Sequence, residues 1–355
     1  MGSRTKVSRR AFFKAAAVSG AAVATWPLIR TSAHAANPEY KMIFADTFAE
    51  ATEKYVATGI DLFKELAERY SDGRLAVDIY RGGTLGGQTE LPQKVQYGAV
   101  QACQVSMQNF VPYAEAYNVL DFPFLFPSNE AFQAFLSSPT FLKSSLISQP
   151  ATKGLNVLVG LWANTGYRVF CTSKRAAREV RLPKDLKGLK VRITNSKVEQ
   201  QAFKLTPASP VSVAWSETYL AMQQGTVDAL NVGLGPLTAN RIQEVVATAT
   251  RLNMSFNAHV AVISKKWHDS LPQPVKDAIE RAGRESWAQQ QKLQEENNQR
   301  MWKEWESLGI KIIDLTPEER KKWIDEVGHQ RPEWKPWKER FGMSLYEQIA
   351  SLDKN

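Results

Sequence analysis

Cysteine and histidine are scarce in this chain, and their scarcity excludes several kinds of site. Of 355 residues, two are cysteines and four are histidines. The chain contains no C-x-x-C pair, no H-E-x-x-H sequence and no G-x-S-x-G sequence. It therefore has neither the usual ligand spacing of a zinc site nor a recognisable catalytic nucleophile. We expect no enzyme activity, no metal and no cofactor.

Phosphate-binding loops and long apolar runs are also missing. The glycine-rich segment from Arg81 to Gly87 has neither the spacing nor the lysine of a P-loop, and it lacks G-x-G-x-x-G. We interpret this segment as a turn beside a cleft. After residue 35, no apolar run is long enough to span a bilayer.

The first 35 residues show the features of an export signal in their usual order. Ser8-Arg9-Arg10-Ala11-Phe12-Phe13-Lys14 matches a twin-arginine motif, an apolar run extends to Ile29, and Ala33-His34-Ala35 is a small-residue cleavage site. The alternative is an N-terminal membrane anchor, but this run is short for a span of roughly 20 residues. We predict that residues 1–35 are a signal peptide that directs the protein to the periplasm.

Removal of this signal changes the charge balance. The signal holds six of the 45 basic residues and no acidic residue, so 39 basic and 36 acidic residues remain, and the net charge falls from +9 to +3. Trp323, Trp334 and Trp337 lie among basic residues, but acidic residues interleave with them. Packing onto the body of the protein explains these tryptophans better than nucleic-acid binding does. We expect no nucleic-acid partner.

Alternating strand and helix patterns predict an α/β fold. In the first part of the chain we expect strands over 41–46, 75–79 and 100–106 and helices over 52–70 and 89–97. This order predicts a mostly parallel, doubly wound sheet. We expect two more strands, over 155–162 and 168–172, separated by a break at 164–166, and an extended segment that returns over 252–264.

A helix predicted over 274–307 would be about 50 Å long, since the rise is about 1.5 Å per residue. Because this exceeds what one small domain needs, we expect the helix to connect two lobes. Lobe I is predicted over 36–165, with about 252–290 returning to it. Lobe II is predicted over 166–251, with about 291–355 completing it and spanning both lobes. The two cysteines, Cys103 and Cys171, would lie in different lobes, so we favour two free buried thiols over a disulfide.

Arg192 lies on a short alternating segment, Lys190-Val191-Arg192-Ile193, that leads into a helix start. Ser196 and Glu199 have the spacing of a capping box, as do Thr316 and Glu319 farther along the chain. A guanidinium beside a helix N-terminus is well suited to bind an anion. A surface arginine paired with a carboxylate would show the same local pattern.

Several ordered motifs cover nearly the whole chain after residue 35. They are Ser71-Asp72-Gly73-Arg74-Leu75, Leu85-Gly86-Gly87, Phe122-Pro123-Phe124, the run from Asp185 to Arg192, the run from Trp215 to Gly225, Val227-Asp228, and Trp267 with Leu271-Pro272. Together they resemble the DctP-type extracytoplasmic substrate-binding proteins of TRAP (tripartite ATP-independent periplasmic) transporters. The resemblance implies a two-lobed periplasmic binding protein fold with cross-lobe strands and a long connecting C-terminal helix. It also implies a cleft that closes on ligand and a closed form that docks on a membrane permease.

The same resemblance implies the residues of a ligand site. Arg192 matches the main carboxylate-binding arginine, Arg168 a second cleft arginine, and Trp215 the aromatic residue that packs on the ligand. The other implied cleft residues are Asn195, Ser106, Met107, Gln108 and Gln88. Many relatives of the sialic-acid type have asparagine at the position of Val232, whereas here Asn231 lies one position earlier. Met107, Phe170, Trp215 and Val232 would then form an apolar pocket, suited to an acid with an aromatic or short aliphatic body.

We therefore predict a periplasmic solute-binding protein that captures an organic acid through an arginine–carboxylate pair and delivers it to a TRAP-type secondary transporter. Its partners would be a small carboxylate ligand and, transiently, the permease subunits, and we expect a monomer. Two alternatives remain open. The protein could be a ligand-sensing partner of a membrane receptor, or an exported enzyme that acts on an acidic substrate.

Overall fold

The computed structural model describes residues 38–48 and 54–352. The predicted signal peptide, residues 1–35, lies outside the described residues. The strands in the described part are β1 (Tyr40–Asp46), β2 (Leu75–Tyr80), β3 (Ala102–Ser106), β4 (Leu155–Ser173), β5 (Lys190–Ile193), β6 (Ser209–Ser212), β7 (Ala229–Gly233), β8 (Val246–Thr250), β9 (Phe256–Ser264) and β10 (Lys311–Ile313).

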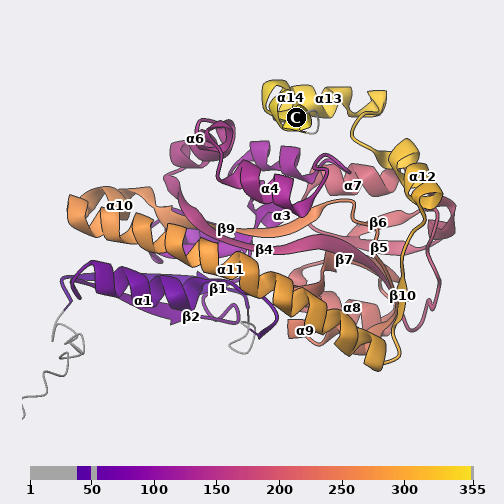
Figure 1. Cartoon of the computed structure of the whole chain (residues 1–355), viewed down its shortest axis with the longest axis horizontal. Coiled ribbons are helices and arrows are strands. Elements are labelled where there is room, and N and C mark those ends of the chain that lie inside the picture. Colours follow the sequence, from indigo (N-terminus) through magenta and orange to yellow (C-terminus); the bar gives the residue numbers. More distant parts are fainter. Residues whose placement is uncertain (1–37, 49–53, 353–355) are drawn as a thin grey trace, which may run out of the picture. The chain divides into compact units, whose positions relative to one another are not determined.

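Helices surround these strands (Figure 1). The α-helices of the described residues are α1 (Ile60–Tyr70), α2 (Leu91–Gln96), α3 (Met107–Phe110), α4 (Asn129–Leu136), α5 (Pro139–Leu142), α6 (Ser145–Thr152), α7 (Lys197–Lys204), α8 (Thr218–Gln224), α9 (Leu234–Ala239), α10 (Lys265–Ser270), α11 (Gln273–Ser307), α12 (Pro317–Val327), α13 (Lys335–Phe341) and α14 (Met343–Ala350). The predicted α/β class is confirmed.

The strands form one mixed sheet in the order β2-β1-β3-β9-β4-β7-β5-β6, with β8 paired to β4 and β10 paired to β8. Pairing is parallel among β2, β1 and β3 and among β7, β5 and β6. The central strands β9 and β4 run antiparallel to each other and to their other neighbours. The prediction of a mostly parallel sheet is therefore wrong at the centre, where these two long strands connect the two parallel parts.

Strand β4 is a single strand of 19 residues, which corrects the prediction of two strands with a break at 164–166. Its register against β9 shifts between Val157 and Trp162 and again between Asn164 and Tyr167. Glycines at both places, Gly160 and Gly166, have positive φ angles of 88° and 84°. Such irregularities bend a strand without ending it, so β4 continues from its β9 pairing into its pairing with β7 and β8.

The first predicted helix is wrong at its start. Residues 54–59 are not α-helical, and α1 begins at Ile60 after Gly59, which has a left-handed φ of 73°. Val56 lies in this non-helical stretch and packs in a small buried cluster with Phe48 and Ala163. The predicted end of the helix at residue 70 is confirmed, since Ser71 is the C-cap and Gly73 has a positive φ.

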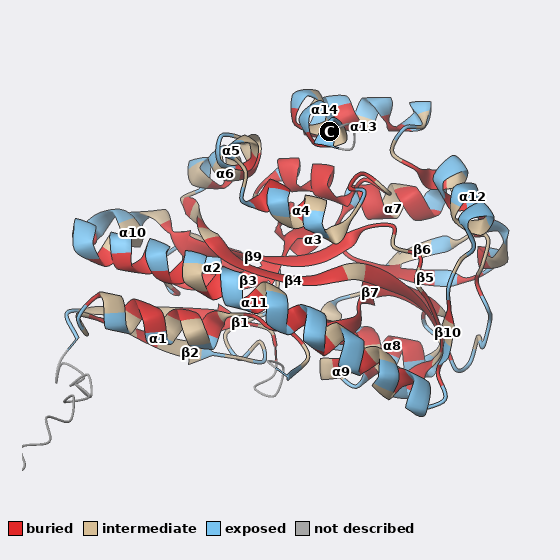
Figure 2. Ribbon diagram, in the orientation of Figure 1, coloured by how far each residue is buried: buried red, intermediate tan, exposed pale blue. Residues whose placement is uncertain are grey.

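Helix α11 packs against elements at both ends of the sheet, and Figure 2 shows a buried stripe and an exposed stripe along it. Its first half contributes Val275 and Ile279 to an apolar cluster with α1, β1 and β2. Its second half contributes Met301 and Trp305 to a cluster with β7, α8 and α9. The predicted long helix is confirmed, and two separate cores depend on it.

Other local predictions are also confirmed. Cys103 and Cys171 are free and buried. Thr316 Oγ1 accepts a hydrogen bond from the backbone N–H of Glu319, whose carboxylate accepts one from the backbone N–H of Thr316, so the capping box forms. Trp323 and Trp334 are fully buried against the body of the protein.

The backbones of β4 and α11 approach so closely that only glycine fits between them. A Cβ atom on Gly160 would lie 2.8 Å from Arg284 Cα and 2.9 Å from its backbone nitrogen. Gly160→Ala should therefore lower the free energy of unfolding by about 2 kcal/mol or more, through the clash and the positive φ together. Chemical denaturation of the two proteins measures the loss.

Gly154→Ala is the matched control, because Gly154 also has a positive φ, 76°, but has open space where a Cβ would lie. It should cost only the backbone strain, about 1 kcal/mol. Equal losses for the two variants would contradict the proposed close contact between strand and helix.

Candidate functional site

A buried cavity lies where the carboxyl ends of β3, β5 and β7 meet the middle of β4 and β9. It is lined by Phe48, Gln88, Ser106, Asn109, Arg168, Arg192, Thr194, Trp215, Val232, Pro236, Asn257 and His259. This inner cavity has a volume of about 20 Å³, which is little more than one water needs. A larger outer cleft of about 680 Å³ shares Gln88, Asn109, Arg192, Thr194 and Trp215 with it. The two together lead from the surface to Arg168.

Arg192 lies where the inner cavity meets the outer cleft, and its side chain is almost entirely buried. Its Nε donates to the backbone carbonyl of Val213 at 3.1 Å, and its guanidinium carbon lies 5.7 Å from the centre of the Trp215 ring. No hydrogen bond from its terminal nitrogens is recorded to any described residue. Burial lowers the pKa of Arg192 to about 10, and the positive charge of Arg168 adds to this effect while Glu199 opposes it. The guanidinium remains charged at neutral pH.

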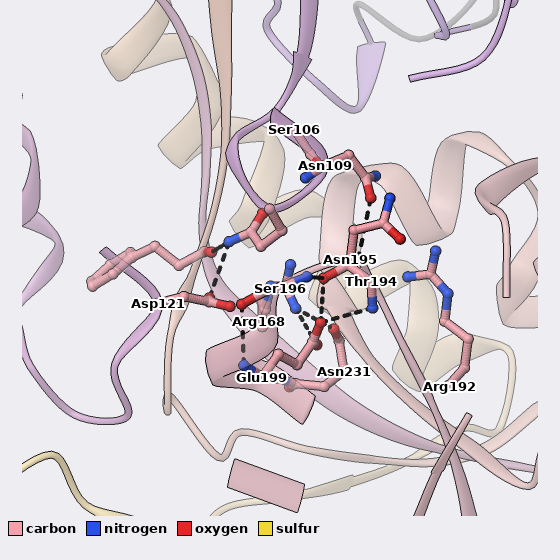
Figure 3. Close-up of polar contacts among 12 residues, drawn as sticks. Ser106, Asn109, Asp121, Arg168, Arg192, Thr194, Asn195, Ser196, Glu199 and Asn231 are labelled. Carbon is pink, nitrogen blue, oxygen red and sulfur yellow. Dashed lines mark hydrogen bonds and ion pairs between the residues drawn. The ribbon is translucent and has the colours of Figure 1, made fainter. Parts of the chain in front are cut away.

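Arg168 on β4 forms a buried ion pair with Glu199 on α7 (Figure 3). The same guanidinium nitrogen donates to the backbone carbonyl of Asn231 at 3.2 Å. The second carboxylate oxygen of Glu199 accepts hydrogen bonds from the backbone N–H and the hydroxyl of Thr194. Both oxygens of Glu199 are therefore occupied within the protein.

The predicted capping box at the start of α7 forms only in part. Ser196 Oγ accepts from the backbone N–H of Glu199 at 3.1 Å, as predicted. The carboxylate of Glu199 turns instead to Thr194 and Arg168. The reason is the buried guanidinium, because a charged partner attracts a carboxylate more strongly than one backbone N–H does.

Two more titratable groups lie close to the ion pair. Asp121 is buried, and one of its oxygens accepts from the side chain of Gln108 at 3.1 Å. Burial raises the pKa of Asp121, while the charge of Arg168 acts in the opposite direction. The ring of His259 lies 4.6 Å from that of Phe48. Burial, helped by the charge of Arg168, lowers the pKa of His259 to about 3, so it is neutral at pH 7.

A chain of hydrogen bonds links Gln88, which directly follows the glycine-rich segment, to the backbone of Asn195. Gln88 Oε1 accepts from the backbone N–H of Ser106 at 3.1 Å and from Asn109 Nδ2 at 3.0 Å. Asn109 Oδ1 in turn accepts from the backbone N–H of Asn195 at 3.4 Å. These contacts fix the rim of the cleft close to Arg192.

The structure brings together most of the residues predicted for the site. Arg192, Arg168, Trp215, Ser106 and Gln88 line the inner cavity, and Asn195 lines the outer cleft. Met107, Gln108 and Asn231 are buried but are not among the lining residues. Gln108 faces away, since its amide donates to Asp121 and to the backbone carbonyl of Phe256.

The expected apolar pocket has a different composition from the predicted one. Trp215 and Val232 line the cavity as predicted, whereas Met107 and Phe170 belong to the core beneath it. Phe48 and Pro236 supply further apolar lining.

Sequence reasoning missed several polar residues of the site. Asn109, Thr194, Asn257 and His259 line the cavity, and Glu199 pairs with Arg168. Asn109 directly follows the predicted residues 106–108, and Thr194 lies between the predicted Arg192 and Asn195. Their closeness in sequence to predicted site residues could have identified both. No local pattern marked Asn257 or His259.

Among residues 38–48 and 54–352, no three histidine, cysteine or carboxylate side chains are grouped so that they could hold a metal ion. No helix in the same part of the chain has the length and apolar character that crossing a membrane requires.

Comparison with known proteins gives consistent matches. Residues 44–335 match the family model DctP, the bacterial extracellular solute-binding protein, family 7. The C4-dicarboxylate-binding periplasmic protein DctP of Rhodobacter capsulatus is 29% identical over 282 residues, which are 79% of this chain and 82% of that protein. The 2,3-diketo-L-gulonate-binding periplasmic protein YiaO of Escherichia coli is 29% identical over 270 residues, 76% of this chain and 79% of the relative.

Solved structures match in fold. The sugar acid binding protein DctPAm from Advenella mimigardefordensis, in complex with galactonate, superposes with a TM-score of 0.81 at 25% identity and covers 89% of this chain and 98% of its own. A TRAP periplasmic solute binding protein from Sulfurospirillum deleyianum with bound succinate has a TM-score of 0.80 at 22% identity and covers 89% and 100%. This second match shows the fold alone.

These matches confirm the two-lobed fold and the family resemblance. They also agree with the lack of catalytic motifs, since the family consists of substrate-binding proteins and not of enzymes. The chain belongs to the DctP family, the bacterial extracellular solute-binding proteins of family 7.

Proposed function

We propose that this protein captures an organic acid by pairing the acid's carboxylate with Arg192 and delivers it to a TRAP-type permease. One observation carries the proposal. Arg192 is a buried cation at a cavity wall, and among the described residues only its Nε has a recorded hydrogen-bond acceptor. A guanidinium offers two parallel donors that match the two oxygens of a carboxylate.

The energetics support a ligand anion at this position. A charge removed from water is costly unless an opposite charge and hydrogen bonds offset the loss. Burial has already lowered the pKa of Arg192, so its ionised form is under-solvated before any ligand arrives. A carboxylate at the terminal nitrogens would supply both the charge and the acceptors.

The named ligands of the relatives point to the same chemical group. C4-dicarboxylates, 2,3-diketo-L-gulonate, galactonate and succinate are all carboxylates. Trp215 would pack on the ligand body, because its ring lies beside the guanidinium and lines both cavities. Ser106, Gln88 and Asn195 would contact the polar groups of the ligand at the rim.

We also propose the extent of the two lobes and the export route of the protein. Lobe I would consist of 36–165 with about 252–290, and lobe II of 166–251 with about 291–355. The lobes would close on the ligand, and the closed monomer would dock on the permease. Residues 1–35 would direct export through the twin-arginine pathway to the periplasm.

Loss of the Arg192 charge should abolish most of the ligand affinity. A charge-assisted hydrogen bond contributes about 1.5–3 kcal/mol, so Arg192→Gln should weaken binding of an organic acid roughly 10–100-fold or more. A melting-temperature screen of organic acids identifies a ligand, and isothermal titration calorimetry then compares the variants.

Arg284→Gln serves as the control, since Arg284 is an exposed arginine on α11. It should bind the ligand as the unchanged protein does. The assignment of Arg192 fails if no acid raises the melting temperature, or if Arg192→Gln binds the best acid with unchanged affinity.

Export should depend on the paired arginines. Replacing both, as Arg9→Lys with Arg10→Lys, should leave the protein in the cytoplasm with an uncleaved N-terminus, whereas Arg4→Lys outside the motif should not. Cell fractionation and N-terminal mass analysis provide the readout. Normal periplasmic yield of the double variant would rule out the twin-arginine route while leaving the ligand assignment unaffected.

A further inference from the structure

The charges around the two cavities leave one cation without an internal counter-ion. Arg168 and Arg192 both line the inner cavity. The side chains of Arg168 and Glu199 are 1% and 2% exposed and form an ion pair, so their charges compensate each other. No ion pair is recorded between Arg192 and any acidic residue in the described part of the chain.

The remaining groups at the inner end add no positive charge. His259 is neutral at pH 7, because its pKa is lowered to about 3. Asp121 can only be neutral or negative, and its raised pKa reflects the cost of ionising it there. The inner cavity therefore offers a ligand one surplus positive charge at most.

The outer cleft does not supply a second positive charge. Among the described residues that line it, Arg192 is the only basic residue and Glu90 the only acidic one.

We propose that this site selects acids with a single carboxylate and that Glu199 sets the selectivity by neutralising Arg168. The inference rests on the proposed function, in which Arg192 holds the first carboxylate. A second carboxylate directed inward would meet an arginine that is already paired, beside the negative Glu199. A second carboxylate directed outward would find Glu90 and no cation. In either direction it would be desolvated without a counter-charge, which is unfavourable.

Uncharged oxygen atoms suit the inner end better. Arg168 Nε and His259 Nδ1 are buried at the cavity wall and have no recorded hydrogen-bond partner. The Arg168 Nε–H is a donor, and a hydroxyl can serve either tautomer of the histidine. A hydroxyl group on a monocarboxylate would satisfy these atoms without adding charge, and a carbonyl group would accept from the Arg168 Nε–H. The expected ligands thus differ from those of the relative named for C4-dicarboxylates.

Matched pairs of acids test the inference on the unchanged protein. Succinate is compared with succinamate, and glutarate with glutaramate, because each pair differs by one carboxylate replaced with a neutral amide. Calorimetry at pH 7 should show tighter binding of the amide, by about tenfold or more, since a like or unpaired charge in a desolvated site costs more than 1.4 kcal/mol. The inference is equally supported if monocarboxylates from the general acid screen bind and neither succinate nor glutarate does.

Glu199→Gln should reduce or reverse the preference for the amide over the matching diacid. Glutamine keeps the size of glutamate and one acceptor for Thr194, but it releases the charge of Arg168 toward the cavity. Glu296→Gln on the exposed face of α11 is the charge-matched control and should leave the preference unchanged. The melting temperature without ligand shows whether each variant is folded, and the comparison on the unchanged protein stands without either variant.

Two results would contradict the inference, and they can be told apart. If either diacid binds the unchanged protein as tightly as its amide, the single-carboxylate selectivity is wrong while the role of Arg192 stands. If no acid of any kind binds, the proposed function itself is wrong and this inference fails with it.

Discussion

The buried ion pair between Arg168 and Glu199 joins the long central strand β4 to helix α7, which follows the strand that carries Arg192. Removing one member of such a pair typically costs about 3–5 kcal/mol, because the other charge is left uncompensated. Glu199 also holds the backbone N–H of Thr194, which follows β5 directly. The hydrogen bond from Thr194 to Glu199 therefore holds the end of β5, the strand that carries Arg192. The pair determines both the geometry of the cavity and the charge that the cavity presents.

The close packing of β4 and α11 provides the frame for this pair. β4 exchanges its pairing with β9 for pairing with β7 and β8 along one continuous strand. α11 crosses it at glycine contacts and contributes to an apolar cluster at each end. The arginine on β4 and the arginine on β5 line one cavity, which lies at the carboxyl ends of the shorter strands.

Local sequence patterns predicted correctly those features that depend on residues close together in the chain. The long helix, the capping box at Thr316 and the end of α1 depend on residues a few positions apart, and all three were predicted. The start of α1 and the continuity of β4 were not predicted. In both cases contacts between distant parts of the chain determine the structure, and the local sequence does not show them. The side chain of Glu199 shows the same competition within the site. Its spacing predicted a contact with the backbone of Ser196, but a buried guanidinium that is 31 positions away in sequence attracts it instead.

By itself, the sequence determined the α/β class, the free cysteines and, through family motifs, the family and the two arginines of the candidate site. Only the tertiary structure decided which arginine is paired and which is available, because Glu199 and Arg168 meet through folding and not through sequence spacing. It also decided that Gln108 and Met107 face away from the cavity and that His259 and Asn257 face it. Burial and the sign of neighbouring charges are properties of the packed interior, and they determine what chemistry Arg192 can perform.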